Sequence, residues 1–201
     1  MSPFAIAADK TSIHADPAQY RARFEEQSSL LFDDIFEPAL LAKLMTRAAA
    51  AHFVKDFIED IGAREKESVQ LIGAAICLLL GRLNLLEWLE TATGTSPLRA
   101  MTGCLAQMRA NGSDALTWHD DMNGKHRMLA LAVNLSDHDF TGGEFEMRRK
   151  GEALPFHQVK YARPGSMMVF AVNPKIEHRV TIVTQGGPRR VFAGWLLSQP
   201  E

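Results

Sequence analysis

The sequence predicts a mainly β protein with N-terminal helices, in which a jelly roll or barrel forms the core and the helices pack on one sheet. Before residue 98 the apolar residues recur with helical periodicity. After it come seven short segments rich in Val, Met, Leu and Phe, separated by Asn-Gly, Gly-Gly and Pro-Gly pairs. Many short strands with frequent turns are typical of two-sheet jelly rolls and barrels. With 201 residues and 46% hydrophobic content, the chain can bury a substantial core.

Residues 1–27 are interpreted as an N-terminal arm followed by a short helix. The first 15 residues have a mixed composition without periodicity, which predicts an arm that lies on the body of the protein. Asp16 followed by Pro17 is typical of a helix start, with a capping side chain and a proline in the first turn. The helix is expected to end near Glu26.

Residues 28–97 are interpreted as a helical support region. The expected elements are a strand-like run over 28–36, a helix opened by Glu37 and Pro38, a helix over about 65–80, and a third helix that ends at Gly94. The second and third helices are separated near Asn84, which with Glu87 has the pattern of a helix cap. Apolar residues on one face of each helix predict packing against a sheet.

Residues 98–201 are interpreted as the β core that would carry the chemistry. The expected strands cover 98–109, 127–135, 143–149, 157–161, 166–172, 178–184 and 189–197. The sequence has no internal repeat, low-complexity stretch or linker. Residues 1–201 are therefore expected to form a single domain.

Composition excludes several classes of function. A net charge of -2 and a pI near 6.4 give no long-range attraction for nucleic acid or anionic lipid. The longest apolar run, which begins at Leu71, is about half the length of a membrane span, and no secretory signal is visible. Cys77 and Cys104 lie in apolar surroundings and are expected to be free thiols. A cytoplasmic protein without a nucleic-acid or membrane partner is expected.

The stretch TWHDDMNGKHR, residues 117–127, contains candidate metal ligands. On an extended backbone His119 and Asp121 would project to the same face, whereas Asp120 would project to the other. This pattern alone arises often by chance. It gains weight from His178 later in the chain, because two imidazoles and one carboxylate on one face of an Fe(II) octahedron leave three adjacent positions open.

Two further stretches extend the pattern. They are VNLSDHDFTGGEFEM, residues 133–147, and RPGSMMVF, residues 163–170. With the three candidate ligands, they make residues 98–197 similar to the Fe(II)/2-oxoglutarate-dependent dioxygenase superfamily and, within it, the prolyl 4-hydroxylase-like group. The resemblance implies a double-stranded β-helix, with His119, Asp121 and His178 as both metal ligands and catalytic residues. It also implies Fe(II), 2-oxoglutarate and dioxygen, with ascorbate as an optional supporting reductant.

The resemblance also implies which residues bind 2-oxoglutarate. An arginine on the last strand should hold the carboxylate remote from iron, because a guanidinium can bind both oxygens in fixed geometry. Arg189 is favoured over Arg190, since alternation places it on the same strand face as Trp195. Asn134 stands where related enzymes often carry a tyrosine that touches the co-substrate. Asn134 and Trp195 are therefore expected beside the co-substrate as well.

The implied activity is hydroxylation of an unactivated C–H bond, coupled to decarboxylation of 2-oxoglutarate to succinate. A residue of a peptide or protein is the first substrate expected, by similarity to prolyl hydroxylases. A free amino acid, another small metabolite, or a non-catalytic module that binds metal or 2-oxoglutarate are the alternatives. Arg127 and Trp118 are candidate substrate residues. A solvated strand end would account for Arg127 equally well, and packing is the more usual role of a tryptophan such as Trp118. The sequence determines neither the substrate nor the oligomeric state.

Overall fold

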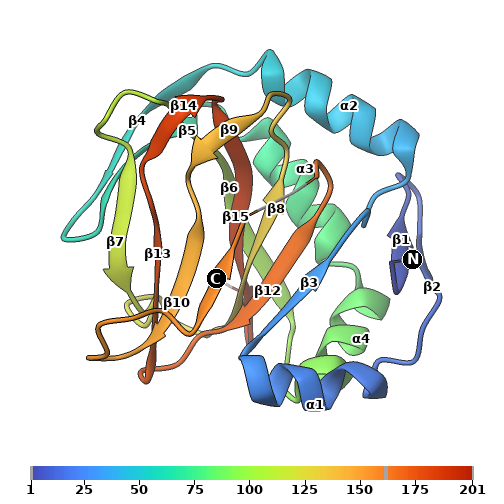
Figure 1. The fold of residues 1–201 in the computed structure, drawn as a ribbon. Helices are drawn as coiled ribbons and strands as arrows, with labels where there is room; N and C mark the ends of the chain where they lie inside the picture. The colour runs from blue at the N-terminus through green and yellow to red at the C-terminus, as the bar shows by residue number, and fades with distance from the viewer. Residues whose placement is uncertain (1, 161–162, 201) are drawn as a thin grey trace.

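Figure 1 shows a computed structural model in which a curled antiparallel sheet carries helices on one side. The structure describes residues 2–160 and 163–200. The helices in these residues are α1 (Ala18–Gln27), α2 (Pro38–Ala49), α3 (Leu71–Leu80) and α4 (Leu83–Thr93). The strands before α4 are β1 (Phe4–Ile6), β2 (Thr11–Ile13), β3 (Ser29–Phe32), β4 (Phe53–Ile58) and β5 (Gly62–Glu67). Those after it are β6 (Ala100–Met108), β7 (Ala115–His119), β8 (Arg127–Asn134), β9 (Phe140–Gly142), β10 (Phe145–Arg149), β11 (His157–Val159), β12 (Met167–Ala171), β13 (Ile176–Val180), β14 (Val183–Gly186) and β15 (Arg189–Leu197).

The main sheet joins eleven of these strands in antiparallel pairs. Their order is β11-β10-β13-β7-β5-β6-β15-β8-β12-β3, with β4 paired to β5. Strand β5 pairs with β6 through Glu65 and Lys66 and with β7 through Gly62 and Ala63, so the sheet curls at this strand. The result is a jelly-roll-like half-barrel with N-terminal helices, which confirms the predicted fold class.

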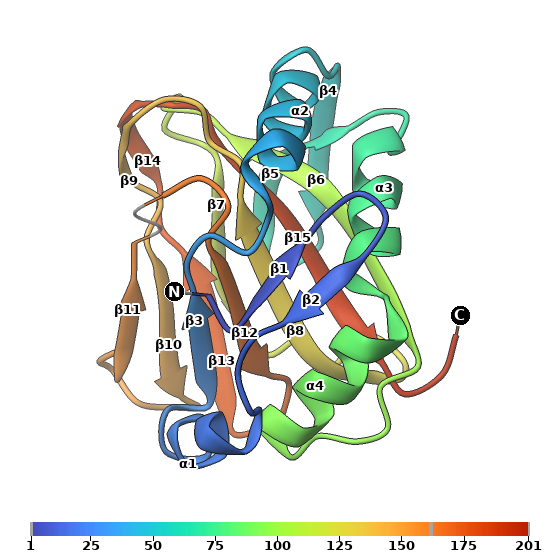
Figure 2. The ribbon, with the colours of Figure 1, turned by 90° about the vertical axis from the view of Figure 1, so that its right-hand side faces the viewer.

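Strand alternation gives the curled sheet two different faces. On β8, Leu129, Leu131 and Val133 belong to the core shared with the helices, whereas Ala130 and Ala132 belong to a second apolar cluster. The first core is built where α3 and α4 cover the sheet, on the side seen in Figure 2. The second cluster lies on the opposite, concave face, where small side chains such as Ala130 and Ala132 leave room for a cavity.

The helix expected over 65–80 is wrong in its first part. Residues up to Glu67 form β5, and α3 begins only at Leu71. The charged sequence GAREKE has no helical periodicity, and Gln70 takes a left-handed conformation with φ of 58° that separates the strand from the helix. Strand β4 precedes β5 as its hairpin partner, so the region 28–97 is not purely a helical support but also contributes a hairpin to the main sheet.

The N-terminal arm is more ordered than its composition predicts. Strands β1 and β2 form a hairpin, and the side chains of Phe4 and Ile6 are fully buried. The ring of Phe4 lies 5.2 Å from that of Trp88 on α4, so the arm is an integral part of the first core. Asn84 does not cap α4 as expected, because it lies inside the helix and its side chain donates to the carbonyl of Thr11 in this arm.

Other boundaries agree with the sequence predictions to within a few residues. The expected strand over 178–184 is divided, because β13 ends at Val180 and β14 begins at Val183. Of the strand expected over 157–161, β11 covers His157–Val159, and Tyr161 lies outside the described residues. Cys77 and Cys104 are free thiols, as expected. Among the described helices none alone has the length and hydropathy of a membrane span; α3 and α4 reach both only as a pair bent by 67°.

The first turn of α3 depends on a buried carboxylate. Glu67, at the end of β5, accepts hydrogen bonds from the backbone N–H of Ile72 at 3.0 Å and of Gly73 at 3.0 Å. These N–H groups have no partner within the helix, and a negative charge near a helix N-terminus is also favoured by the helix dipole. Glu67 therefore links the sheet to the helix that covers it.

We expect Glu67→Ala to lower the free energy of unfolding by about 2–3 kcal/mol, because buried N–H groups would lose a charged acceptor. Chemical denaturation monitored by circular dichroism would measure the change. Glu59→Ala, at an exposed position after β4, is the matched control and should shift stability by less than about 0.5 kcal/mol. Equal stability of the two variants would show that Glu67 does not anchor α3.

Candidate metal centre and active-site cavity

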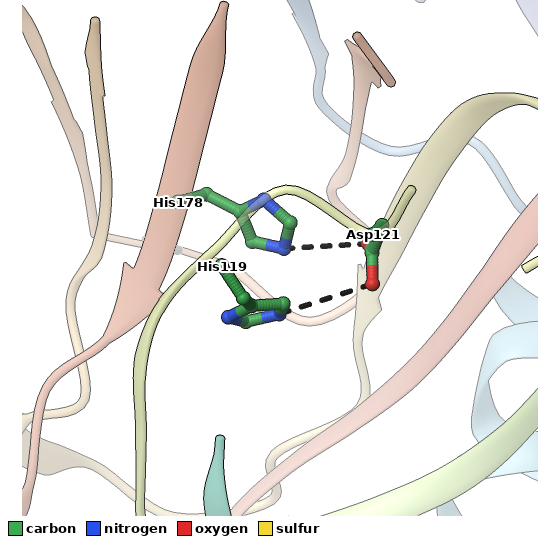
Figure 3. A group of neighbouring side chains, drawn as sticks. All are labelled: His119, Asp121 and His178. Carbon is green, nitrogen blue, oxygen red and sulfur yellow. Dashed lines mark ion pairs between the residues drawn. The ribbon is translucent and has the colours of Figure 1, made fainter. Parts of the chain in front are cut away.

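Three potential metal ligands converge on the concave face of the sheet. His119 is the last residue of β7, and His178 lies opposite it on β13 in the antiparallel register. Figure 3 shows the two imidazoles and the Asp121 carboxylate pointing toward one another. The Nε2 atoms of His119 and His178 lie 3.9 and 3.4 Å from the carboxylate oxygens, and one ligand atom from each residue fits within 4.8 Å of the others. The structure thus brings together the three residues that the sequence selected.

The reason for this convergence differs from the one expected. Strand β7 ends at His119, and Asp121 has a left-handed backbone with φ of 60°, so a turn rather than strand alternation directs its carboxylate toward the imidazoles. Aspartate tolerates this conformation better than most residues. Asp120 points elsewhere, as predicted, because its carboxylate accepts hydrogen bonds from the N–H of Met122 and from Lys150.

The surroundings of both histidines prepare them to bind a metal. Burial, with repulsion from His119, lowers the pKa of His178 to about 3, which keeps this imidazole neutral. Its ring packs against those of Phe145 and Phe170, at centroid distances of 5.4 and 4.8 Å. The Nδ1 of His119 lies 2.7 Å from the carbonyl of Thr117, which can only accept, so Nδ1 carries the proton and Nε2 faces the cluster.

This donor set fits a divalent iron ion. Two imidazoles and one carboxylate on one side of a small space match the facial arrangement used by non-haem Fe(II) oxygenases. His178 lies within a strand, His119 ends a strand and Asp121 lies in the turn that follows. The backbone therefore holds all three ligands in position before a metal binds. The rest of the coordination sphere is left to small ligands that enter from the cavity.

Two neighbouring side chains position the carboxylate of Asp121. The indole Nε1 of Trp195 donates to its Oδ2 at 3.0 Å. Arg127 donates to the backbone carbonyl of Asp121 at 3.2 Å, and the same nitrogen lies 3.6 Å from Oδ1. The Arg127 guanidinium also stacks on the Trp195 ring at 3.7 Å. Together these contacts fix the orientation of the carboxylate, so both residues act on a metal ligand, although the sequence suggested co-substrate binding for Trp195 and substrate binding for Arg127.

A cavity of about 290 Å³ opens beside the three ligands. From β15 its wall includes Arg189, Val191, Ala193 and Trp195, the residues that alternation places on one strand face. Arg190 does not line the cavity, and its guanidinium donates instead to the carboxylate of Asp137 at 2.8 Å. The structure therefore places Arg189, rather than Arg190, at the cavity, as the sequence favoured.

The Gly-Gly-Glu stretch makes room for Arg189. A Cβ atom on Gly143 would lie 2.6 Å from Cδ of Arg189, and its φ of 65° also suits glycine. Glu144, next in sequence, accepts a hydrogen bond from the Thr181 hydroxyl, and that bond is the main cause that lowers the pKa of Glu144. The motif thus shapes the wall beside Arg189 and fixes the turn that carries it.

Two candidate residues are not at the cavity. Asn134 is buried, and its amide donates to the carbonyl of Arg163 at 3.1 Å and accepts from the N–H of Ser136, so it stabilises a turn at the end of β8. Trp118 projects from the opposite face of β7, and its ring contacts the guanidinium groups of Arg148 and Arg179, at 4.2 and 4.6 Å. Because i and i+1 residues of a strand point in opposite directions, Trp118 could not share the cavity with His119.

The sequence reasoning missed the hairpin that forms another wall. Five residues of β4, β5 and their connection line the cavity: Asp56, Ile58, Ile61, Arg64 and Lys66. The signal was present in the alternation of charge types along GAREKE, which is typical of a strand with two different faces. A helical interpretation of that segment concealed it.

Comparison with known proteins agrees with the geometry of the site. Residues 105–197 match the model of the 2OG-Fe(II) oxygenase superfamily, a segment that includes all three ligands and Arg189. No sequence among curated proteins matches the chain. The family match therefore rests on the β core and its ligands.

Solved structures share the fold at low sequence identity. A 2OG-Fe(II) oxygenase family oxidoreductase from Burkholderia pseudomallei is 16% identical, with a TM-score of 0.68 over 99% of this chain and 97% of that one. A Trichoplax adhaerens prolyl hydroxylase, in complex with a hypoxia inducible factor oxygen degradation domain peptide fragment, is 11% identical, with a TM-score of 0.65 over 88% and 86%. A Pseudomonas putida prolyl-4-hydroxylase is 19% identical, with a TM-score of 0.62 over 92% and 100%.

We expect Trp195→Phe to weaken binding of Mn(II), a redox-stable substitute for Fe(II), by about tenfold, because losing a hydrogen bond to a ligating carboxylate typically costs one to two orders of magnitude. Electron paramagnetic resonance titration of free Mn(II) would measure the dissociation constant. Trp118→Phe, on the outer face of β7, is the matched control and should bind Mn(II) like the unmodified protein. Identical affinities for both variants would show that the indole does not position Asp121.

Proposed function

This chain belongs to the 2OG-Fe(II) oxygenase superfamily, and we propose that it is a prolyl hydroxylase-like enzyme that hydroxylates an unactivated C–H bond in a peptide or protein. The observation that carries the proposal is the placement of His119, Asp121 and His178 in one wall of a cavity that also contains Arg189. A histidine pair near a carboxylate, or a buried arginine, occurs alone in proteins of many functions. Together they provide a metal site and a carboxylate site within one cavity.

Fe(II) and 2-oxoglutarate would supply the oxidation: with dioxygen, 2-oxoglutarate is converted to succinate and carbon dioxide, and the second oxygen atom enters the substrate C–H bond. His119, Asp121 and His178 would hold the iron. Arg189 would bind the 2-oxoglutarate carboxylate that is remote from the metal, since its guanidinium is buried in the cavity wall and carries the charge that a carboxylate requires. The protein thereby fixes the position of both groups before the substrate enters.

The cavity walls favour an apolar reacting group. Leu116, Phe145, Phe170 and Val180 surround the ligands with aliphatic and aromatic surface, which excludes water from the reacting centre. A saturated ring such as that of proline has the matching character. The similarity in fold to prolyl hydroxylases supports the same substrate.

We expect Arg189→Gln to weaken 2-oxoglutarate binding by at least about tenfold, because a buried charge-assisted pair would be lost. The visible absorption band that appears when 2-oxoglutarate is added anaerobically to the Fe(II)-loaded protein would be titrated. Arg109→Gln is the control, since Arg109 is half-exposed, pairs with Glu65 and does not line the cavity. A protein that shows no band at any 2-oxoglutarate concentration would overturn the proposed function.

Incubation of the enzyme with cell extract, Fe(II), ascorbate and 2-oxoglutarate should yield a peptide whose mass increases by one oxygen atom at a prolyl residue, detected by mass spectrometry. The His178→Ala protein, which lacks one ligand, should give no such product. An oxygen atom gained by a free metabolite, with none gained by peptides, would replace the peptide proposal with a small-molecule hydroxylase.

A further inference from the structure

The hairpin wall carries charges that iron and 2-oxoglutarate do not explain. Arg64 and Lys66 of β5 face the cavity together with Asp56 of β4. The Nε of Arg64 lies 3.0 Å from one Asp56 oxygen, and Nζ of Lys66 lies 3.6 Å from the other. One carboxylate thus serves two cations on the same wall.

Strand β5 separates its charges by sign. Arg64 and Lys66 lie on the cavity face, whereas Glu65 and Glu67 lie on the other face and have partners there. Glu65 accepts hydrogen bonds from Gln107 and Arg109, and Glu67 binds the N-terminus of α3. The acidic residues nearest in sequence therefore cannot neutralise the two cavity cations.

The net charge of the cavity stays positive after Fe(II) and 2-oxoglutarate bind. Among the described residues that line it, the cations are Arg64, Lys66, Arg127 and Arg189, and the carboxylates are Asp56 and Asp121. Fe(II) and 2-oxoglutarate carry equal and opposite charges, so binding both leaves the excess of cations unchanged. A cleft with one dominant sign of charge and apolar walls attracts a ligand of the opposite sign.

Arg64 is suited to bind such a ligand. Only 12% of its side chain is exposed, compared with 40% for Lys66, so Arg64 lies within the wall and Lys66 lies nearer to solvent. Its Nη2 contacts the sulfur of Cys104 at 3.5 Å, and a thiol is a weak acceptor. A carboxylate in place of that contact would form a much stronger, charge-assisted hydrogen bond.

We propose that the substrate carries a carboxylate, which Arg64 and Lys66 bind while the apolar part of the substrate faces the metal ligands. This inference rests on the proposed function and adds the chemical class of the substrate. The carboxylate can belong to an acidic side chain beside the reacting residue of a peptide, or to the reacting amino acid itself when it is a free small molecule. Both sources present the same chemistry to the hairpin wall.

Matched probes separate these sources. The peptide pair is acetyl-Ala-Pro-Glu-Ala-amide and the same peptide with Gln in place of Glu; the small-molecule pair is N-acetylproline and its amide. Binding is measured by calorimetry to protein loaded with Mn(II) and 2-oxoglutarate, so that no turnover occurs. The carboxylate member of at least one pair is expected to bind about tenfold more tightly, and the preference should decrease with added salt. The pair that shows the preference identifies the source.

Two substitutions distinguish a binding role from a structural one, because both break the same ion pair. Arg64→Gln should reduce the preference for the carboxylate probe by about tenfold, whereas Asp56→Asn should increase it, since the wall loses its only carboxylate among the described residues. If the ion pair merely stabilised the hairpin, both variants would change probe binding in the same direction. Lys66→Gln should reduce the preference by a smaller factor, because Lys66 is more exposed.

Equal binding within both probe pairs, a preference for the neutral members, or parallel effects of Arg64→Gln and Asp56→Asn would each overturn the inference. If no probe binds although 2-oxoglutarate does, the inference fails while the proposed function stands. If 2-oxoglutarate itself does not bind the Fe(II)-loaded protein, the proposed function fails instead. The two failures are therefore distinguishable in the same protein preparation.

Discussion

The antiparallel pairing of β7 with β13 is the constraint on which the site depends. This register sets His119 directly opposite His178, and the turn after β7 then returns Asp121 to the same place. A shift of one residue in either strand would send one imidazole to the other face of the sheet. The site is therefore a product of strand register, and the many long-range pairs of the curled sheet hold that register in place.

Because side chains alternate along a strand, one face of each strand packs in the core and the other face lines the cavity. On β15, Phe192 and Leu196 join the core beneath the helices, whereas Arg189 and Trp195 face the cavity. On β8, the alternation places leucines toward the helices and alanines toward the cavity, where their small size leaves space. Helices on one face are thus what allow the other face to remain partly open.

Much of this arrangement could be predicted from the sequence because it depends on local patterns. The choice of Arg189 over Arg190 and most strands follow from alternation. The three ligands followed from their residue types and from the family resemblance, because Asp121 reaches the site through a turn and not through strand alternation. The roles of Asn134 and Trp118 could not be predicted in this way, since they depend on which neighbouring carbonyls and guanidinium groups lie within reach in the folded chain. The hairpin wall was missed for another reason: the alternating charges of GAREKE were visible in the sequence but were assigned to a helix, although this segment pairs with the adjacent strand β4 along its whole length.

Strand β5 shows how specificity and stability can be kept apart in one short segment. Glu67 supports α3 from one face, while Arg64 and Lys66 meet the cavity from the other, so neither task constrains the residues that perform the other. Point mutations on the cavity face can exchange the recognised molecule without disturbing the metal ligands, which come from β7, the turn after it and β13. Evolution of this scaffold toward new substrates can therefore proceed through a few codons of one hairpin while the oxidation chemistry is inherited unchanged.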